Sequence, residues 1–302
     1  MLSRVAVSLY QTGRRLEAAD HLARILDVHH SVYLDRPGEL SPDFWDRFLN
    51  LASIRSQPGL GAEAAAALAI AEIQSQAARA REAALAVRPS ISTEFFEQLT
   101  VLNWSCRADS AQLHDYLTAI QLGAHLLTGL AEDSMNHDEA WNFLRLGRYR
   151  ERALNVARLV TVKLAEIDDE PVLWAAVLRC CWALESYRWR YSAPVTVEGV
   201  VGFLLLDRHL PRSVAFAINE ALAAARQIDG ARTKSAPHRV LGRMSALFDY
   251  TEQAEVVADP SAFGMQFFSM VETLDRTLAS TYFRPSKVAA TTLAIMNEQS
   301  GQ

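Results

Sequence analysis

Cysteine is scarce in this sequence, and long apolar runs are missing. The 302 residues include three cysteines, Cys106, Cys180 and Cys181. An odd number of cysteines, two of them adjacent in the sequence, argues against a disulfide framework and is typical of a protein in a reducing compartment. We therefore expect buried free thiols and a cytoplasmic protein. The longest apolar runs, such as residues 64–70, are far shorter than the roughly 20 residues of a membrane-spanning helix, so no membrane partner is expected.

The sequence also lacks the short motifs of self-contained catalysts. It has no Gly-rich phosphate loop, no CxxC pair, no HExxH and no GxSxG. We predict no metal site and no cofactor. The net charge of −5 gives no general basic field, so no nucleic-acid partner is expected. Residues 187–191 (YRWRY) mix aromatic and basic side chains, but arginine stems packed on an aromatic helix explain this pattern better than a nucleic-acid surface.

Strand signals are absent as well, since no segment alternates convincingly and no hairpin turn is visible. Apolar residues recur at helical spacing along almost the whole chain. Prolines stand at or near several expected first turns, where a helix tolerates them. The predicted fold is all-α, a helical bundle built from two related halves in one compact unit. Its expected helices span residues 2–30, 44–54, 62–87, 92–104, 110–130, 137–167, 172–191, 197–206, 211–227, 237–251 and 260–283.

An internal repeat is the reason for expecting two halves. Residues 13–24 (GRRLEAADHLAR) reappear as residues 147–158 (GRYRERALNVAR), with six of the twelve positions identical. The two copies start 134 residues apart, which is far longer than the roughly 20–50 residues of a solenoid unit. We predict a first, diverged half over residues 1–134, a second half over 135–284 and a disordered tail over 285–302.

Each copy of the repeat carries charged residues on one helix face, because they are spaced three or four residues apart. The first ladder is Arg14, Glu17, His21 and Arg24, and the second is Arg148, Glu151, Asn155 and Arg158. Three interpretations stay open. Facing ladders would form a pocket for a carboxylate or phosphate, because arginine binds planar oxyanions through two N–H groups. Alternatively, the ladders are solvated faces, or a buried ion network that locks the halves together.

These blocks resemble the bacterial alpha-E family, whose domain is all-helical. The resemblance covers nearly the whole chain, and its most specific part is residues 140–153 (AWNFLRLGRYRERA). It is also carried by residues 1–10 (MLSRVAVSLY), 203–207 (FLLLD), 211–214 (PRSV) and 281–283 (TYF). The first block of the family usually reads GRYLERAE, from which this chain departs at Arg15, Ala18 and Asp20. Leu154 stands where the family prefers an acidic residue.

The resemblance implies partners rather than a settled reaction. Such proteins are typically encoded beside a circularly permuted ATP-grasp ligase and a transglutaminase-like peptidase, in a set thought to make or modify peptides through ATP-driven amide chemistry. The expected partners are therefore the ATP-grasp ligase, the transglutaminase-like peptidase, and a peptide or small carboxylate substrate. Whether the chain is itself an enzyme stays open.

Two functions are expected on this basis. In the first, the chain is a component of an ATP-grasp-dependent peptide ligation or modification system and holds a carboxylate or acyl-phosphate substrate. Glu151 and Glu17 would then be catalytic, positioning or deprotonating an amine. The binding residues would be Arg148, Arg158, Arg14, Arg24, Tyr149 and Arg212. In the alternative, the chain is a noncatalytic helical adaptor that docks on the ATP-grasp partner; an isolated binder of a small anion is a third, less supported option.

Overall fold

The computed structural model describes residues 1–36, 38–107, 112–165, 171–231 and 234–283. These residues form helices without any strand, so the predicted all-α class is confirmed for them. The tail expected over residues 285–302 lies outside the described residues. The α-helices are α1 (Ser3–Asp35), α2 (Phe44–Leu51), α3 (Ala62–Leu85), α4 (Thr93–Ser105), α5 (Leu113–Ser134), α6 (Glu139–Ala165), α7 (Pro171–Cys180), α8 (Leu184–Tyr191), α9 (Val197–Val201), α10 (Val214–Asp229), α11 (Ala236–Tyr250), α12 (Gln253–Ala258) and α13 (Pro260–Leu278).

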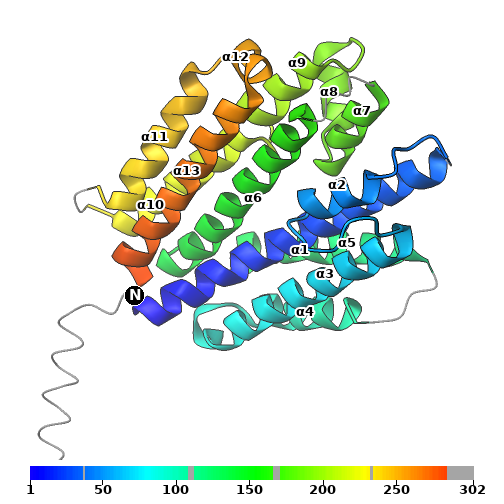
Figure 1. Ribbon diagram of the computed structural model, residues 1–302. Helices are drawn as coiled ribbons and strands as arrows, with labels where there is room; N and C mark the ends of the chain where they lie inside the picture. The colour runs from blue at the N-terminus through cyan, green and yellow to red at the C-terminus, as the bar shows by residue number, and fades with distance from the viewer. Residues whose placement is uncertain (37, 108–111, 166–170, 232–233, 284–302) are drawn as a thin grey trace, which may run out of the picture.

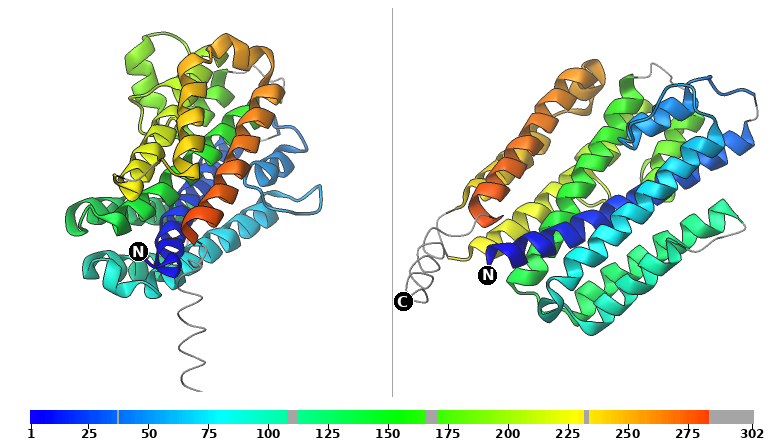
Figure 2. Two further views of the ribbon diagram at one scale, coloured as in Figure 1. Left: turned by 90° about the vertical axis from the view of Figure 1, so that its left-hand side faces the viewer. Right: turned by 60° about the horizontal axis from the view of Figure 1, so that its bottom comes forward.

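Two long helices, α1 and α6, pack against each other in the middle of the molecule (Figure 1). On one side α1 also packs on α3 and α5, whereas α6 packs on α10 and α13 on the other side (Figure 2). The buried apolar residues of all these helices form one continuous core. The repeated segments therefore lie at the centre of the fold, and the division into residues 1–134 and 135–284 stays a prediction.

The crossing of α1 and α6 is tight because each helix presents a glycine to the other. A Cβ added at Gly13 would lie 2.0 Å from the carbonyl oxygen of Leu144. A Cβ added at Gly147 would lie 2.0 Å from the carbonyl oxygen of Tyr10. Gly13 and Gly147 are equivalent positions of the repeat, and so are Tyr10 and Leu144. The contact is thus reciprocal, and only a residue without a side chain allows the two backbones to come this close.

Helix boundaries differ from the prediction where the backbone turns without a glycine or proline signal. The single helix expected over residues 172–191 is wrong, because α7 ends at Cys180 and α8 begins at Leu184. Between them Trp182 adopts a left-handed conformation with a φ of 51°, which is unfavourable for a bulky residue. Its neighbour Ala183 closes the turn by donating its N–H to the carbonyl of Leu178.

The structure also differs from the prediction at the end of the first helix and in one additional short helix. The helix expected to end at residue 30 continues to Asp35 as part of α1. The short helix α12 was not expected; it begins with a capping box in which the side chains of Glu252 and Glu255 bind each other's backbone N–H groups. None of the described helices combines the length and the apolar character that crossing a bilayer requires.

Candidate functional site

The two repeated ladders face each other across the helix crossing, and their charges pair reciprocally. The Nε of Arg14 on α1 lies 2.8 Å from Glu151 Oε2 on α6. The equivalent pair in the opposite direction joins Arg148 Nε to Glu17 Oε2 at 3.5 Å. Both glutamates are buried, with 5% and 8% of Glu17 and Glu151 exposed. Of the three interpretations of the ladders, the buried ion network matches this geometry.

Glu17 is held by three arginines. Arg152 donates through two N–H groups, at 2.8 Å to Oε1 and 2.7 Å to Oε2, in the planar fork that suits a carboxylate. Arg212, in the turn before α10, donates to the same Oε1 at 3.1 Å. Burial alone would raise the pKa of Glu17, but Arg152, Arg212 and Arg148 together hold it well below its usual range. Glu17 is therefore ionised at neutral pH.

Asp20 extends this centre by one turn of α1. Its Oδ2 accepts from Arg24 at 3.1 Å and from Arg212 at 3.1 and 3.2 Å. Burial opposes ionisation of Asp20, but Arg24 and Arg212 outweigh it and lower the pKa to about 2. Arg24 also donates to the backbone carbonyl of Cys180 at the end of α7. Desolvation, with repulsion from Arg24 and Arg152, lowers the pKa of Arg212 to about 10.

Two histidines border the Glu17 centre. His21, on the same helix, is buried, and desolvation lowers its pKa to about 3, so its imidazole is neutral at pH 7. His125 on α5 accepts through Nε2 from Arg212 at 3.1 Å, while its Nδ1 lies 2.6 Å from the carbonyl of Gln121. Because a carbonyl can only accept, His125 Nδ1 carries the proton. The ring of Trp182 stacks on His125 at 4.3 Å, which places the strained turn after α7 directly against the network.

Glu151 has fewer partners and a more open surrounding. Besides Arg14, its Oε2 accepts from Arg150 Nη1 at 2.7 Å. Arg150 in turn binds Asp275 on α13, with Nε 3.0 Å from Oδ1 and a second bond from Nη2 to Oδ2. The side chain of Arg14 is 28% exposed, whereas that of Arg152 beside Glu17 is 4% exposed. The second centre is therefore a chain of ion pairs that leads from α1 to α13.

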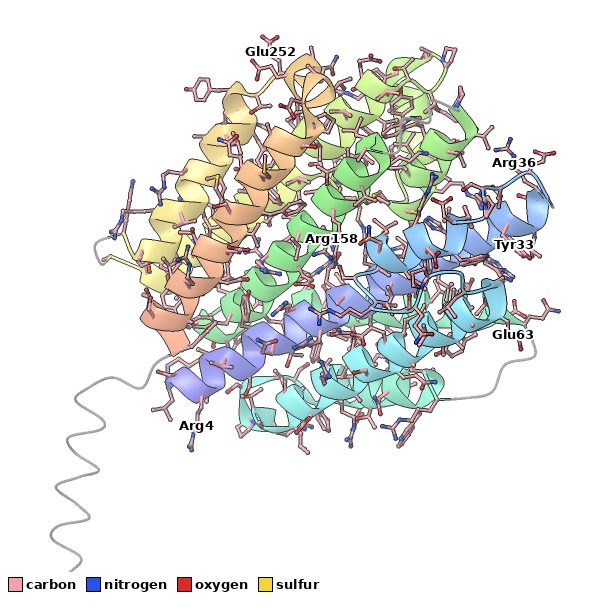
Figure 3. The ribbon with its side chains drawn as sticks, in the orientation of Figure 1. Arg4, Tyr33, Arg36, Glu63, Arg158 and Glu252 are labelled. Atoms are coloured by element: carbon pink, nitrogen blue, oxygen red, sulfur yellow. The ribbon has the colours of Figure 1, made fainter. Side chains whose placement is uncertain are left out.

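Arg158 contrasts with its repeat equivalent Arg24. Arg24 has Asp20 four residues before it, but Leu154 occupies that position before Arg158. The half-buried Arg158 guanidinium makes no hydrogen bond or ion pair within the described residues, and desolvation lowers its pKa. Figure 3 shows Arg158 in the middle of the molecule, unlike Arg4, which projects from its edge. Leu154, at the position where the first copy of the repeat has Asp20, thus gives Arg158 no acidic residue four positions before it.

Tyr149, another predicted binding residue, serves as a platform for arginines. The guanidinium carbons of Arg145, Arg148 and Arg152 lie 5.7, 5.4 and 5.2 Å from its ring centroid. A cation over an aromatic face is stabilised by the ring quadrupole, so Tyr149 helps to keep like charges close together. Its own side chain is buried.

The site contains little free space. A cavity of about 30 Å³ borders Glu17, Asp20, Arg148, Arg152 and Arg212, which is enough for about one or two water molecules. All eight predicted site residues lie on or beside the crossing: Glu151, Glu17, Arg148, Arg158, Arg14, Arg24, Tyr149 and Arg212. In the described part of the chain this small cavity is the space that remains between the ladders, because the carboxylates and guanidiniums contact each other directly.

Five residues that complete the network were not predicted. They are charged or titratable, and none belongs to the two ladders: Asp20, His125, Arg150, Arg152 and Asp275. Asp20, Arg150 and Arg152 carry a usable signal, because each places a charge inside the apolar stripe of a central helix. His125 and Asp275 carry none, since their helices are far from the repeat in the sequence.

The remaining candidates have structural explanations. Asp138 caps α6 by accepting from the backbone N–H groups of Ala140 and Trp141. In residues 187–191, Tyr187 is buried, whereas Trp189 is 92% exposed. Within the described ranges no cluster of three or more His, Cys, Asp or Glu side chains is arranged to hold a metal ion.

The chain matches the model of a known protein family. A family model named Alpha-E, described as a predicted alpha-helical domain with a conserved ER motif, matches residues 1–283. The chain belongs to the Alpha-E family. Glu151–Arg152 is the single Glu-Arg dipeptide in the sequence, so these two residues are the counterpart of the ER motif. In the structure they serve different centres: Glu151 binds Arg14, and Arg152 binds Glu17.

Two curated relatives match part of the chain. The chain is 27% identical over 176 residues to Uncharacterized protein Rv2567 of Mycobacterium tuberculosis (strain ATCC 25618 / H37Rv) and to Uncharacterized protein Mb2597 of Mycobacterium bovis. The alignment covers 57% of this chain and 20% of each relative, so the matched region spans about a fifth of their length. No solved structure matches the chain.

Proposed function

We propose that this chain is a noncatalytic helical adaptor that docks on an ATP-grasp ligase in a peptide ligation or modification system. The observation that carries the adaptor role is the direct pairing of the two ladder glutamates with arginines across the crossing. Glu17 and Glu151 are both engaged by arginines of the opposite helix, and the adjoining cavity has room for about one or two waters. A glutamate that is already engaged by arginines of the opposite helix holds a fold together rather than a substrate.

The electrostatics of Glu17 support the same role. A general base must accept a proton near neutral pH, so its pKa should lie close to the working pH. The pKa of Glu17 is held well below its usual range by three arginines, which makes it a poor base. The association with an ATP-grasp ligase rests on the family resemblance of the sequence.

The test is reconstitution with an ATP-grasp protein encoded beside the chain. ATP hydrolysis, peptide product and complex formation would be measured with the wild type, with Glu151→Gln and with Glu63→Gln. Glu63 is an exposed residue on α3 and serves as the matched control. An adaptor predicts that Glu151→Gln supports product formation at the wild-type level once the complex has formed.

One observation favours a second function, that of holding a carboxylate substrate. Around Glu17 and Asp20 four arginines face two carboxylates, which leaves an excess of two positive charges in a buried centre: Arg24, Arg148, Arg152 and Arg212. An anion entering the small cavity would offset this excess. The same reconstitution separates the two functions: loss of product with Glu151→Gln, while the complex persists, would replace the adaptor by the substrate-holding function.

A further inference from the structure

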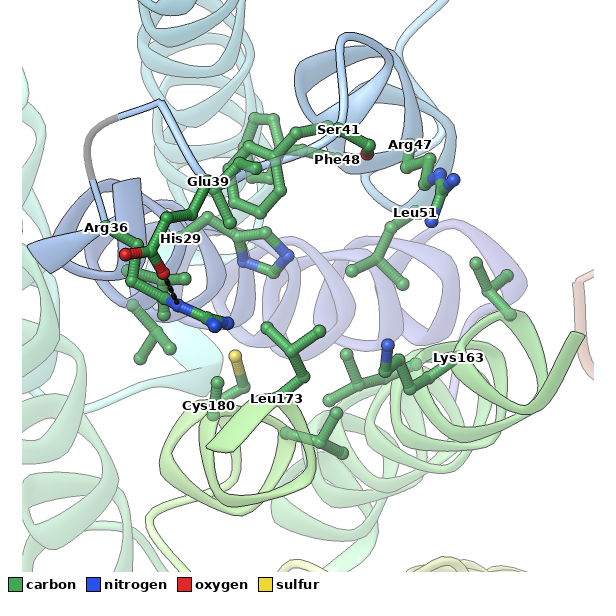
Figure 4. Close-up of a pocket in the computed structure, with 18 residues that line it drawn as sticks. His29, Arg36, Glu39, Ser41, Arg47, Phe48, Leu51, Lys163, Leu173 and Cys180 are labelled. Carbon is green, nitrogen blue, oxygen red and sulfur yellow. Dashed lines mark hydrogen bonds and ion pairs between the residues drawn. The ribbon is translucent and has the colours of Figure 1, made fainter. Parts of the chain in front are cut away.

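A cavity away from the ladders is large enough for a small molecule. It measures about 370 Å³ and is bounded by α1, the segment after it, α2, α6 and α7 (Figure 4). This volume falls within the roughly 300–1,000 Å³ that is typical of small-molecule sites. The cavity beside Glu17, at about 30 Å³, is more than tenfold smaller.

Most of the side chains that line the large cavity are apolar. Phe48 and Leu51 of α2 lie across it from Leu173 of α7 (Figure 4). Leu159 of α6 and Val177 of α7 complete the apolar wall. An apolar group that displaces water from such a surface is stabilised by roughly 25 cal/mol for each Å² buried. The body of a ligand that fits here is therefore hydrocarbon or aromatic.

The guanidinium groups at this cavity are already engaged in ion pairs. Arg36 binds Glu39 at 3.1 Å, as the dashed line in Figure 4 shows, and Arg47 binds Asp43 at 2.7 Å. A charged ligand loses its hydration when it enters an apolar cavity, and only a new ion pair offsets this cost. Because these two arginines have their counter-charges within the chain, the cavity favours an uncharged ligand.

One polar side chain, that of His29 on α1, is built into the apolar wall. Its ring contacts those of Phe44 and Phe48, with centroid distances of 5.7 and 5.1 Å. Its Nδ1 lies 2.7 Å from the carbonyl oxygen of Ile25. Because a carbonyl can only accept, Nδ1 carries the proton. Desolvation, together with the positive charge of Lys163, lowers the pKa of His29 to about 4, so the ring is neutral at pH 7.

The second ring nitrogen of His29, Nε2, is then a hydrogen-bond acceptor. It has no hydrogen-bond partner within the described residues, although His29 lines the cavity (Figure 4). An acceptor that is removed from water without a donor is costly, and a donor supplied by a ligand would recover that cost. The cavity thus combines an apolar wall with one unfilled acceptor.

We propose that this cavity binds an uncharged, largely apolar phenol or alcohol whose hydroxyl donates to His29 Nε2 and whose body lies against α2, α6 and α7. The site goes beyond the adaptor role and does not depend on it. It adjoins the ion network, because Cys180 lines the cavity while its carbonyl accepts from Arg24.

The ligand class is tested with three probes that share one apolar body. Binding of 4-butylphenol, its methyl ether 4-butylanisole and the anion 4-butylbenzoate to the full chain would be measured by isothermal titration calorimetry at pH 7. We expect the phenol to bind at one site and the ether, which has no donor, to bind at least about fivefold more weakly. The benzoate should bind at least about tenfold more weakly than the phenol, because it must be desolvated. No binding of the phenol, or equal binding of the phenol and either analogue, would overturn the proposal.

The role of His29 is tested by removing its acceptor and keeping an aromatic ring. His29→Phe should reduce the preference for the phenol over the ether to about twofold or less, because neither probe then finds an acceptor. His30→Phe, a change outside the cavity on the same helix, should keep the wild-type preference. In the wild type, the nitrogen-15 resonance of His29 Nε2 should shift on addition of the phenol but not of the ether. A preference that survives in His29→Phe, or an unchanged resonance, would refute the assigned hydrogen bond.

The location is tested with two neighbouring alanines of α7. Ala176 lines the cavity and Ala175 does not, although both are half-buried on the same helix. We expect Ala176→Phe to weaken 4-butylphenol binding at least about tenfold by filling the space, and Ala175→Phe to leave it within about twofold of the wild type. Circular dichroism and thermal unfolding would establish that both variants are folded. Undiminished binding by folded Ala176→Phe would show that the phenol binds elsewhere and would refute the site.

Discussion

The two glutamates of the repeat occupy equivalent positions on α1 and α6 but differ in their surroundings. Glu17 is bound by Arg152 in a two-pronged contact, and Arg212 and Arg148 complete its shell. Glu151 has only single contacts with Arg14 and Arg150. The backbones cross in the same way on both sides, so the difference arises from side chains alone.

The cause is a substitution on the opposite helix. Arg152, which binds Glu17, has Ala18 as its equivalent on α1, so Glu151 has no matching two-pronged partner. The second difference is Leu154, which stands at the position equivalent to Asp20 and does not give Arg158 the partner that Asp20 gives to Arg24. A residue missing from one copy of the repeat therefore weakens a contact of the other copy, because the ladders pair across the crossing.

The largest loss of stability is expected from a change in the close crossing of α1 and α6, which both glutamate centres share. Gly147→Ala should destabilise the protein by about 4 kcal/mol or more, because the new Cβ would meet the Tyr10 carbonyl at 2.0 Å and force the helices apart. Gly129→Ala is the control, since nothing lies within 4 Å of its Cβ position. It should be neutral or slightly stabilising, as alanine favours a helix. Urea unfolding measures both, and equal stability of the two variants would contradict the close crossing.

The next test compares the glutamates directly. Glu17→Gln should lower the free energy of unfolding by about 3–5 kcal/mol, because it leaves buried arginines without their counter-charge. Glu151→Gln should cost only about 1–2 kcal/mol, since its partners are fewer and Arg14 is partly hydrated. Chemical denaturation of both variants measures the two losses of unfolding free energy. A larger loss for Glu151→Gln would reverse the assignment of Glu17 as the main anchor.

A pH series tests another difference between the ladders, the replacement of His21 by Asn155. The pKa values of His21 and His29 in the folded state are lowered to about 3 and 4, below the roughly 6.5 of an unfolded chain. The unfolded state therefore binds more protons below pH 6.5, and each histidine removes about 1.4 kcal/mol of stability per pH unit between about pH 6 and 4. Below about pH 4 the decline continues, because the unfolded chain protonates Glu17 and Asp20 while the folded protein keeps both carboxylates ionised.

The variant His21→Asn gives α1 the residue that α6 carries. It should remove about half of the slope of unfolding free energy against pH between pH 6 and 4, as measured by urea unfolding at half-unit intervals. The wild-type slope retained in full by the variant would show that His21 is solvated in the folded state.

The smallest effect concerns the lost acidic residue. Leu154→Asp should create an ion pair with Arg158 four residues later, as Asp20 does with Arg24. A double-mutant cycle with Arg158→Met isolates this pair from the packing that Leu154 contributes. We expect a favourable coupling of about 0.3–0.5 kcal/mol. A coupling of zero would mean that the Arg158 guanidinium points away from position 154.

The sequence predicts the helices well but predicts the network only in part. Apolar spacing of 3.6 residues is a local property, so the all-α class and most helix positions follow from it. The break at Trp182 does not, because neither glycine nor proline marks it and packing against His125 holds it in place. The ladders were found because they repeat.

The partners of the ladders could not be read in the same way. Spacing along one helix suggests pairs three or four residues apart, but Glu17 binds arginines 135 and 195 residues away. Which charges meet depends on how α1, α6 and α10 cross, and this information is not local. Asp275, which continues the Glu151 chain onto α13, illustrates the same limit.

The long separation of these contacts has a consequence for how the protein is made. Residues of α1 find their buried polar partners at Arg152, Cys180 and Arg212, which are 135, 156 and 195 residues further along the chain. Until the ribosome has passed residue 212, the carboxylates of Glu17 and Asp20 must stay hydrated. Closing such long loops is slow compared with forming a helix. The segment at the centre of the core is thus synthesised early but loses its water only after most of the chain exists.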